Sequence, residues 1–209
     1  SHMLKTQKHG IWFQKSAFHG YIFPAMSLFL ITFLGNPGIQ YEQTRHNAGR
    51  LLAGCACFAD ADWAQKFKGL HARITCSRVP VCLLKPETFM NASGESVQAA
   101  ACYYRISPDR ILVVHDELEL PFGTTEIRLG GGTGGHNGIR SIGTALGTTS
   151  FWRFRIGIGR PAHGNVDSHV LSKFSGEERE WLPHLLSGSA RDLELFLAYQ
   201  APKKTTHFT

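Results

Sequence analysis

Short apolar runs alternate along the chain with segments of helical periodicity. Residues 28–34 are almost wholly apolar and lead into a Pro-Gly turn, and residues 111–114 form a second continuous run, which is typical of a strand covered on both faces. We predict two further strands at residues 74–77 and 81–84, joined by a short polar connection. Residues 151–158 alternate between large apolar residues and Arg or Gly, so they predict a strand with one apolar face.

Three other segments have the patterns of helices. Residues 44–61 are rich in Leu, Ala and Cys, and a second helix is predicted to begin at Ser93, which can cap it, and to stop at Pro108. Its apolar positions follow helical spacing: Val97, Ala100, Ala101 and Tyr104. The C-terminal part ends in a helix with an apolar stripe at Leu193, Phe196 and Leu197. This alternation predicts an α/β fold, a single domain with a twisted, mostly parallel mixed sheet flanked by helices.

The length and charge of the chain set broad limits. A chain of 209 residues suits one domain, and the net charge of +6 fits a nucleic-acid partner as well as a solvated basic surface. We expect the domain to span residues 26–209, with Met26 as the natural start. Residues 1–25 are interpreted as a tag remnant, Ser1-His2-Met3, followed by an N-terminal extension. No segment is long and apolar enough to predict a membrane span.

The five cysteines indicate the cellular compartment. Their number is odd, they lie among apolar neighbours and they form no C-x-x-C pair. This usage favours reduced, mostly buried thiols over a disulfide framework or a zinc site. We therefore expect a cytoplasmic protein.

Polar residues follow the ends of several predicted strands. Asn36 follows the first strand, residues 85–91 follow the strand at 81–84, and His115-Asp116 follows the run at 111–114. A glycine-rich loop that contains His136-Asn137 follows residues 126–129. Open α/β sheets bind ligands beyond the carboxyl ends of their strands, so we expect these groups to meet at one edge. Because neighbouring side chains of a strand point to opposite sides, only one of His115 and Asp116 faces this site, and we choose Asp116.

Six sequence blocks, taken together, resemble the bacterial peptidyl-tRNA hydrolase family. They occur in the family's order between about Leu28 and Phe174, and they are Gly35-Asn36-Pro37-Gly38 with Tyr41, Thr44-Arg45-His46-Asn47-Ala48-Gly49, Lys85-Pro86-Glu87-Thr88-Phe89-Met90-Asn91, His115-Asp116-Glu117-Leu118, Gly131-Gly132-Thr133-Gly134-Gly135-His136-Asn137-Gly138 and Gly157-Ile158-Gly159-Arg160-Pro161. The resemblance implies a monomeric α/β hydrolase that cleaves the ester between a peptide and the terminal ribose of tRNA, recycling tRNA from stalled translation. It implies no cofactor, no metal, no DNA and no membrane partner.

By position, the resemblance makes His46 the general base and Asp116 the carboxylate that orients it. An imidazole titrates near neutral pH, and a carboxylate on its second nitrogen fixes the tautomer and raises its basicity. Water is then the nucleophile, since the chain has no G-x-S-x-G elbow and no cysteine in the matched blocks. The resemblance also implies residues that hold substrate and water, namely Asn36, Tyr41, Phe89, Met90, Asn91 and Asn137. Phe89 and Met90 fit a core role equally well, and Asn47 and His136 fit supporting roles.

Basic residues are candidates for contacts to the tRNA backbone. Arg128 and Arg155 match positions where the family binds phosphate. Arg153 lies on the same face as Arg155, and for Arg153 a phosphate contact and a solvated position at a sheet edge are equally good interpretations. Two departures weaken the match for phosphate binding. Glu126 stands where the family commonly has a basic residue, and residues 162–164 lack the lysine often found there.

Other functions remain to be weighed. The loop formally fits G-x-G-x-x-G, yet no acidic residue follows about 20 positions on, which argues against a dinucleotide site. A metal-dependent hydrolase could use His46, His115, Asp116 and His136 as ligands. Their spacing in the sequence matches no known metal-binding motif, which argues against this alternative. A third possibility is a tRNA-binding module without catalysis.

Overall fold

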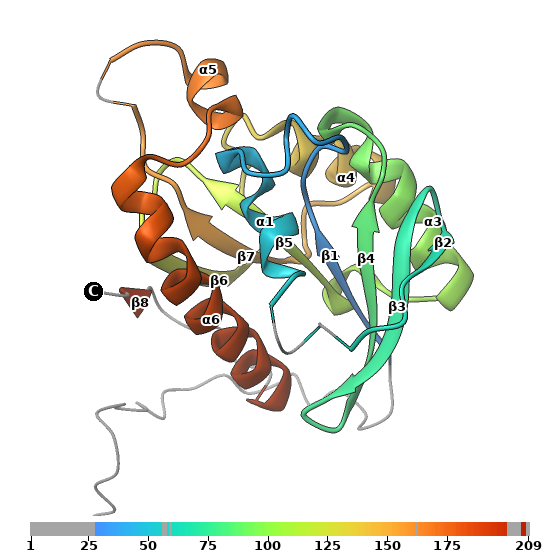
Figure 1. The fold of residues 1–209 in the computed structure, drawn as a ribbon. Helices are drawn as coiled ribbons and strands as arrows, with labels where there is room; N and C mark the ends of the chain where they lie inside the picture. The colour runs from blue at the N-terminus through green and yellow to red at the C-terminus, as the bar shows by residue number, and fades with distance from the viewer. Residues whose placement is uncertain (1–27, 56–57, 59, 162, 200–205, 208–209) are drawn as a thin grey trace, which may run out of the picture.

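Eight strands of the described residues form one mixed sheet at the centre of the molecule, in the order β2-β3-β4-β1-β5-β7-β6-β8 (Figure 1). The computed structural model describes residues 28–55, 58, 60–161, 163–199 and 206–207, so the predictions for residues 1–25 and for Met26 lie outside it. The strands are β1 (Phe29–Phe33), β2 (Ala64–Lys66), β3 (Gly69–Cys76), β4 (Val79–Pro86), β5 (Ile111–Glu117), β6 (Thr124–Leu129), β7 (Trp152–Gly157) and β8 (Thr206–His207).

Parallel pairing is confined to the four central strands. Strand β1 pairs in parallel with β4 and β5, and β5 pairs in parallel with β7, whereas the other four pairings are antiparallel. On one side of the sheet the antiparallel pairing follows from tight turns: Phe67-Lys68 links β2 to β3, and Ser77-Arg78 links β3 to β4, all with positive φ. The mixed sheet within a single α/β domain is confirmed, while its mostly parallel character holds only for the centre.

Helices cover both faces of the sheet. The helices that lie wholly within the described residues are α1 (Ala48–Leu52), α3 (Ser93–Tyr104), α4 (Asn137–Leu146), α5 (Val166–Leu171) and α6 (Gly176–Tyr199), with short 3-10 turns η1 (Arg45–Asn47), η2 (Met90–Ala92) and η3 (Pro108–Arg110). No described helix combines the length and the apolar composition that a membrane crossing needs.

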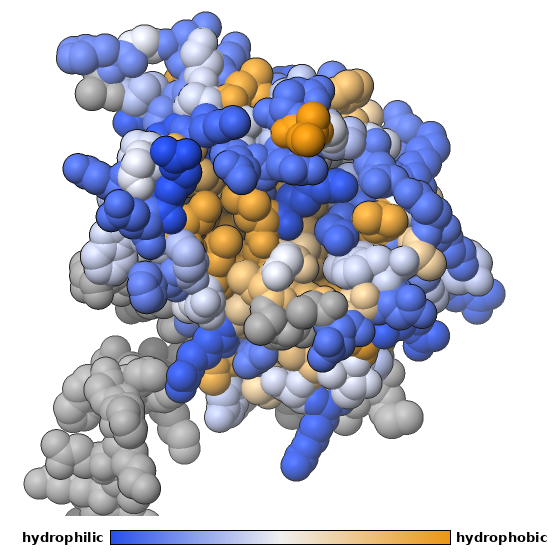
Figure 2. All heavy atoms as spheres, viewed as in Figure 1, coloured by the Kyte–Doolittle hydropathy of each residue, from blue (hydrophilic) through white to orange (hydrophobic). Residues whose placement is uncertain are grey.

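Alternating side chains of the central strands divide the interior into two apolar cores. Phe29, Ile31 and Phe33 pack with α1 and α6 in the first core, while Leu30 packs with α3 and α4 in the second. The predicted apolar face of residues 151–158 lies in the first core, as does the stripe of the C-terminal helix. Figure 2 shows apolar atoms gathered between α6 and the central strands, bordered by hydrophilic side chains. These cores fix the strand ends that carry the polar residues.

Two helix predictions need correction. The helix expected over residues 44–61 is interrupted: within residues 44–55 the structure has η1 and the five-residue α1, and i→i−3 hydrogen bonds from Gly54 and Cys55 form a turn after Leu52, while Phe58 is again helical. Residues 56, 57 and 59 lie outside the description. Ser93 is the first residue of α3 and makes no cap bond, because η2 runs directly into this helix and Ser141 Oγ accepts the Gly94 N–H. The helix ends at Tyr104, ahead of Pro108.

The described cysteines are free thiols, and they are less buried than expected. Cys82 is buried, Cys55 and Cys76 are half-buried, and Cys102 is exposed. The fifth, Cys57, lies outside the description. Burial raises the pKa of the Cys82 thiol to about 12, so this sulfur stays protonated near neutral pH.

Candidate active site

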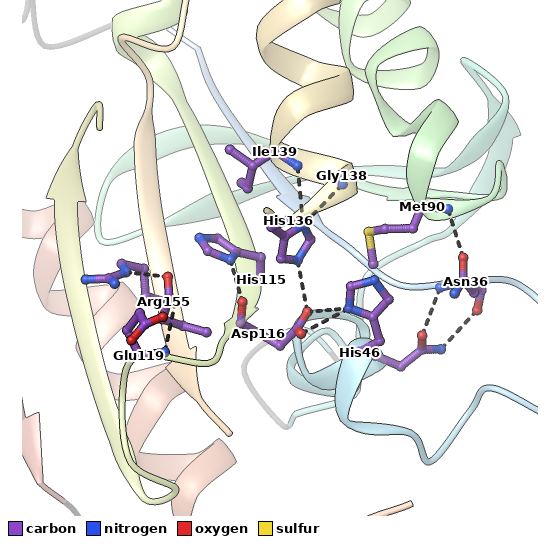
Figure 3. A network of polar contacts seen from close by, with 12 residues as sticks. Asn36, His46, Met90, His115, Asp116, Glu119, His136, Gly138, Ile139 and Arg155 are labelled. Carbon is purple, nitrogen blue, oxygen red and sulfur yellow. Dashed lines mark hydrogen bonds and ion pairs between the residues drawn. The ribbon is translucent and has the colours of Figure 1, made fainter. Parts of the chain in front are cut away.

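His46 and Asp116 meet at the carboxyl end of β5 (Figure 3). The Nδ1 atom of His46 lies 3.0 Å from both carboxylate oxygens of Asp116. Asp116 lies two residues after Val114, so its side chain points to the face that α1 covers, and η1 places His46 immediately before α1. Asp116 is only 2% exposed. Strand alternation and the short η1–α1 segment thus bring together two residues 70 positions apart in sequence.

His136 is the second imidazole on Asp116. Its Nε2 lies 3.0 Å from Asp116 Oδ1, while its Nδ1 accepts the backbone N–H groups of Gly138 and Ile139 at the start of α4 (Figure 3). A neutral imidazole carries one hydrogen, so the two accepted bonds at Nδ1 place that hydrogen on Nε2. His136 therefore caps α4 and donates to Asp116, and its ring centroid lies 5.0 Å from that of His46.

Opposite charges stabilise the ionised forms of the pair. Burial alone lowers the pKa of the His46 imidazole, but the charge of Asp116 and the hydrogen bond to it, with a smaller contribution from Asp167, raise the net pKa above the ordinary 6.5. Burial alone raises the pKa of the Asp116 carboxyl, but His46 and His136 together hold it far below its usual range. Asp116 is thus a carboxylate at neutral pH, and the His46 imidazole becomes a stronger base.

His115 lies on the opposite side of the strand, as alternation predicts. Its Nδ1 donates to the backbone carbonyl of Asp116 at 2.7 Å, and its Nε2 is buried without a hydrogen-bond partner in the described part of the chain. Burial and the neighbouring His136 hold the pKa of His115 well below 6.5, so the ring is neutral. This geometry makes His115 a packing residue against His136, whose ring centroid lies 4.9 Å away.

Arg45 fixes the backbone next to His46, and the sequence did not single it out for this. Its guanidinium donates to Ser172 Oγ and to the Lys173 carbonyl, both at 2.6 Å, and forms an ion pair with Glu178. It also lies over the ring of Phe174, 5.5 Å from the centroid. The partners lie more than 120 positions away in sequence, so no local pattern signals them.

Asn36 and Asn47 form a closed hydrogen-bonded pair. Asn47 accepts the Asn36 backbone N–H at 2.8 Å and donates to the Asn36 carbonyl at 2.9 Å. The side-chain oxygen of Asn36 in turn accepts the Met90 backbone N–H at 2.8 Å. This bond, which Figure 3 shows between Asn36 and Met90, fixes the Asn36 amide so that its Nδ2 donors remain for another partner. Asn47 supports the loop through its two bonds to the Asn36 backbone.

The remaining predicted substrate residues differ in exposure. Phe89 is 61% exposed and Asn91 is exposed, whereas Met90 is buried in the second core. Asn137 is exposed, and its Oδ1 accepts from Arg140 at 2.6 Å. Tyr41 is half-buried. The Phe89 ring and the two amides are thus accessible to a ligand, while the Met90 side chain belongs mainly to the core.

The glycine loop reaches the site by a different route from the one expected. Because β6 is antiparallel to β7, its carboxyl end lies at the opposite edge of the sheet. The loop then runs back to His136, and Arg153 holds it by donating to the carbonyls of Gly131, at 2.6 Å, and Gly132. Arg153 is buried by this contact, so the interpretation as a solvated sheet edge is wrong for it, and its contact with phosphate stays a prediction.

The two other basic candidates lie on this side of the sheet. Arg155 is buried and paired with Glu117 and Glu126. Arg128 is half-buried, and its Nε has no hydrogen-bond partner among the described residues. Arg155 is therefore already paired with two carboxylates, whereas Arg128 keeps a guanidinium N–H that has no acceptor among the described residues.

His46, Asp116 and His136 each offer a ligand atom, all within 4.8 Å of one another, which raises the question of a metal ion. A metal on His136 would need the lone pair of Nε2, and the ring hydrogen would then move to Nδ1. That hydrogen would face the N–H groups of Gly138 and Ile139. The donor set therefore does not fit a metal ion while α4 keeps this cap.

Comparisons with known proteins agree with this geometry. A sequence profile described as peptidyl-tRNA hydrolase matches residues 30–209. The peptidyl-tRNA hydrolase of Pelobacter propionicus is 45% identical over 185 residues, covering 88% of this chain and 96% of the relative. That of Treponema pallidum is 46% identical over 181 residues, covering 80% and 86%. The crystal structure of the Acinetobacter baumannii enzyme superposes with a TM-score of 0.73 at 36% identity, covering 87% of this chain and 92% of the other.

Proposed function

The chain belongs to the peptidyl-tRNA hydrolase family and hydrolyses the ester between peptide and tRNA, and we propose that His46 and Asp116 carry out this reaction. The contact between His46 Nδ1 and the Asp116 carboxylate is the observation that carries the proposal. It directs the Nδ1 hydrogen to the carboxylate, so the lone pair lies on Nε2. A base with this tautomer and a raised pKa suits the activation of water.

The proposed reaction has two proton transfers. His46 Nε2 takes a proton from a water molecule as its oxygen attacks the ester carbonyl carbon. The tetrahedral intermediate then expels the ribose oxygen, which receives the proton from the imidazolium. Asp116 stays ionised throughout and stabilises the positive charge that His46 acquires in the first step. His136 donates to the same carboxylate and keeps it facing His46.

Three amides are proposed to hold the substrate and the water. Asn36 offers Nδ2 donors from a fixed orientation, which suits the carbonyl of the ester or the water. Asn91 and Asn137 present exposed amides, which suit the peptide backbone and the 3′ end of the tRNA. Tyr41, which is half-buried, and Phe89, which is exposed, are proposed to offer ring surface to the substrate, and Met90 contributes through its packing. Arg128 and Arg155 are proposed to contact tRNA phosphates.

The requirements, the partner and the location of the enzyme are also part of the proposed function. The reaction is proposed to be metal-independent, since His136 Nδ1 accepts two backbone N–H groups and its Nε2 hydrogen is directed to Asp116. It is also proposed to need no cofactor. The partner is peptidyl-tRNA, not DNA or a membrane, and the enzyme acts as a monomer in the cytoplasm, where translation supplies its substrate. Abolition of activity by EDTA and recovery with zinc would contradict the metal-independent part.

A direct test compares the wild type with His46→Ala on an N-blocked aminoacyl-tRNA and on a free aminoacyl-tRNA. We expect the wild type to prefer the blocked substrate, and the variant to lose roughly 10²- to 10⁴-fold in cleavage rate, the usual share of a general base. Binding of uncharged tRNA, measured separately, should remain. Full cleavage by the variant would refute the role of His46, and a tRNA-binding module without catalysis predicts no cleavage by either protein.

A further inference from the structure

The guanidinium of Arg155 lies between two carboxylates. Its Nε donates to Glu117 Oε2 at 2.9 Å, and its Nη1 forms an ion pair with Glu126. The side chains of Glu117 and Glu126 are 15% and 25% exposed, and Arg155 is buried between them. Arg155 and its two carboxylate partners together carry a charge of about −1 at neutral pH, while Arg128 and Arg153 lie further along the same face. A residue proposed to bind phosphate is therefore flanked by two carboxylates that compete with phosphate for its guanidinium.

The register of the sheet builds this arrangement. Glu126 lies directly opposite Arg155 in the β6–β7 pair, and Glu117 is two residues beyond His115, which lies opposite Arg155 in the β5–β7 pair. All three side chains thus project from paired strands on the same face. The sheet thus places these three side chains next to one another whatever the conformation of the loops.

The two carboxylates hold Arg155 in different ways. Glu117 also accepts the backbone N–H of Glu119 at 3.1 Å, so it is tied into the turn that follows β5. Within the described part of the chain, Glu126 has a polar contact with Arg155 alone, and it is the more exposed of the two carboxylates. It is therefore the carboxylate that can give way to an incoming phosphate, while Glu117 keeps Arg155 in place.

We propose that Glu126 limits the affinity for tRNA by competing with a backbone phosphate for Arg155. This inference rests on the proposed function, because it assumes that a tRNA phosphate approaches Arg155. Binding then exchanges one anion for another on the same guanidinium, and Glu126 loses its partner in the complex. Because of this exchange, Arg155 binds phosphate more weakly than an unpaired arginine would. Glu126 thus influences the affinity for tRNA without touching the reacting atoms.

Glu126→Gln tests the exchange, and Glu119→Gln is its matched control. Glu119 pairs with Arg160 at 2.9 Å, and both side chains are more than half exposed, so the control removes an equal charge from a neighbouring pair and leaves the Arg155 pair intact. The ligand is an uncharged acceptor-stem RNA hairpin with a single-stranded 3′ end, so binding is measured without hydrolysis.

We expect Glu126→Gln to tighten binding by roughly two- to fivefold, the range that one ion pair near the surface allows. The salt dependence should steepen by about one ion, because no freed carboxylate takes up a cation when the phosphate is bound. In hydrolysis assays the effect should fall on KM more than on kcat. Glu119→Gln should change binding by less than half as much.

Unchanged or weaker binding by Glu126→Gln, or an equal gain in Glu119→Gln, would overturn the inference. Glu126→Thr, which favours a strand, repeats the test if the glutamine variant folds poorly. The wild type separates the two proposals. If it cleaves peptidyl-tRNA and Glu126→Gln binds like it, only this inference fails, whereas a wild type that neither binds nor cleaves refutes the proposed function as well.

Discussion

At the scale of single residues, the site depends on where three hydrogens lie. His46 Nδ1 and His136 Nε2 both direct a hydrogen to the Asp116 carboxylate, and the Met90 N–H fixes the Asn36 amide. Each of these side chains therefore has one defined role as donor or acceptor before substrate arrives. Preorganisation of this kind lowers the cost of reaching the transition state, because the groups need not reorient during the reaction.

Substitution of His136 separates its two roles. Asn at this position can still cap α4 but is too short to hold the Asp116 carboxylate, whereas Ala does neither. We expect both variants to lower kcat, and His136→Ala alone to lose about 1 kcal/mol of unfolding free energy through the missing cap. Steady-state kinetics and urea unfolding of the two variants check this. Equal losses of unfolding free energy in His136→Asn and His136→Ala would contradict the role of His136 as the cap of α4.

At the scale of secondary-structure elements, α1 must approach the sheet closely to carry His46 to Asp116. Gly49 makes this possible, because a Cβ there would meet the backbone carbonyl oxygens of Val114 and Leu34, the second at 2.9 Å. The short helix thus lies directly on the carboxyl ends of two central strands.

Gly49→Ala should push α1 away from β5. We expect a loss of about 1–3 kcal/mol in unfolding free energy, the usual cost of overpacking, together with a lower kcat because His46 moves with the helix. Gly176→Ala is the control, since no atom lies within 4 Å of a Cβ at the start of α6. Thermal unfolding and kinetics of both variants give the comparison, and similar behaviour of the two would contradict the close-approach argument.

At this scale the sequence predicted some elements and missed others for physical reasons. Residues 28–34 and 111–114 were recognised as strands because strands buried on both faces are continuously apolar. Residues 44–61 were predicted as one helix because composition favours helix there, while the turn at Gly54 depends on hydrogen bonds that close locally. The antiparallel direction of β6 relative to β7 could not be predicted either, since local sequence patterns do not distinguish parallel from antiparallel pairing.

At the scale of the whole molecule, the site joins segments that lie far apart in the chain. The pairing of His46 with Asp116 followed from strand alternation and the family resemblance, whereas the anchoring of Arg45 by Ser172 and Glu178 could not be foreseen. Such contacts depend on how the C-terminal part folds back over η1, and no residue spacing encodes that. The polar residues at the strand ends could thus be predicted from the sequence, whereas the long-range contacts that hold them in place could be identified only in the folded structure.

Acid unfolding reports on Asp116 in the whole molecule. Its pKa is far lower in the folded state than the ordinary 3.8, so its contribution to stability is present above that value and is lost as the pH falls. We expect the unfolding free energy of the wild type to decline between pH 5 and 3 by up to about 1.4 kcal/mol per pH unit more steeply than that of Asp116→Asn. His46 is protonated in both states over this range, because its folded pKa is raised, and so adds nothing to the slope. Urea unfolding at each pH measures the slopes, and equal slopes would contradict an ionised, stabilised Asp116.

The central claim is that His46 acts as a base whose strength Asp116 sets, and the pH dependence of kcat/KM tests it most directly. For the wild type, kcat/KM should rise with pH as His46 loses its proton, with a midpoint above 6.5. In Asp116→Asn the loss of the negative charge lowers the pKa of His46, so the midpoint should move to lower pH while the plateau falls. A midpoint that stays in place, or a plateau equal to that of the wild type, would contradict the account.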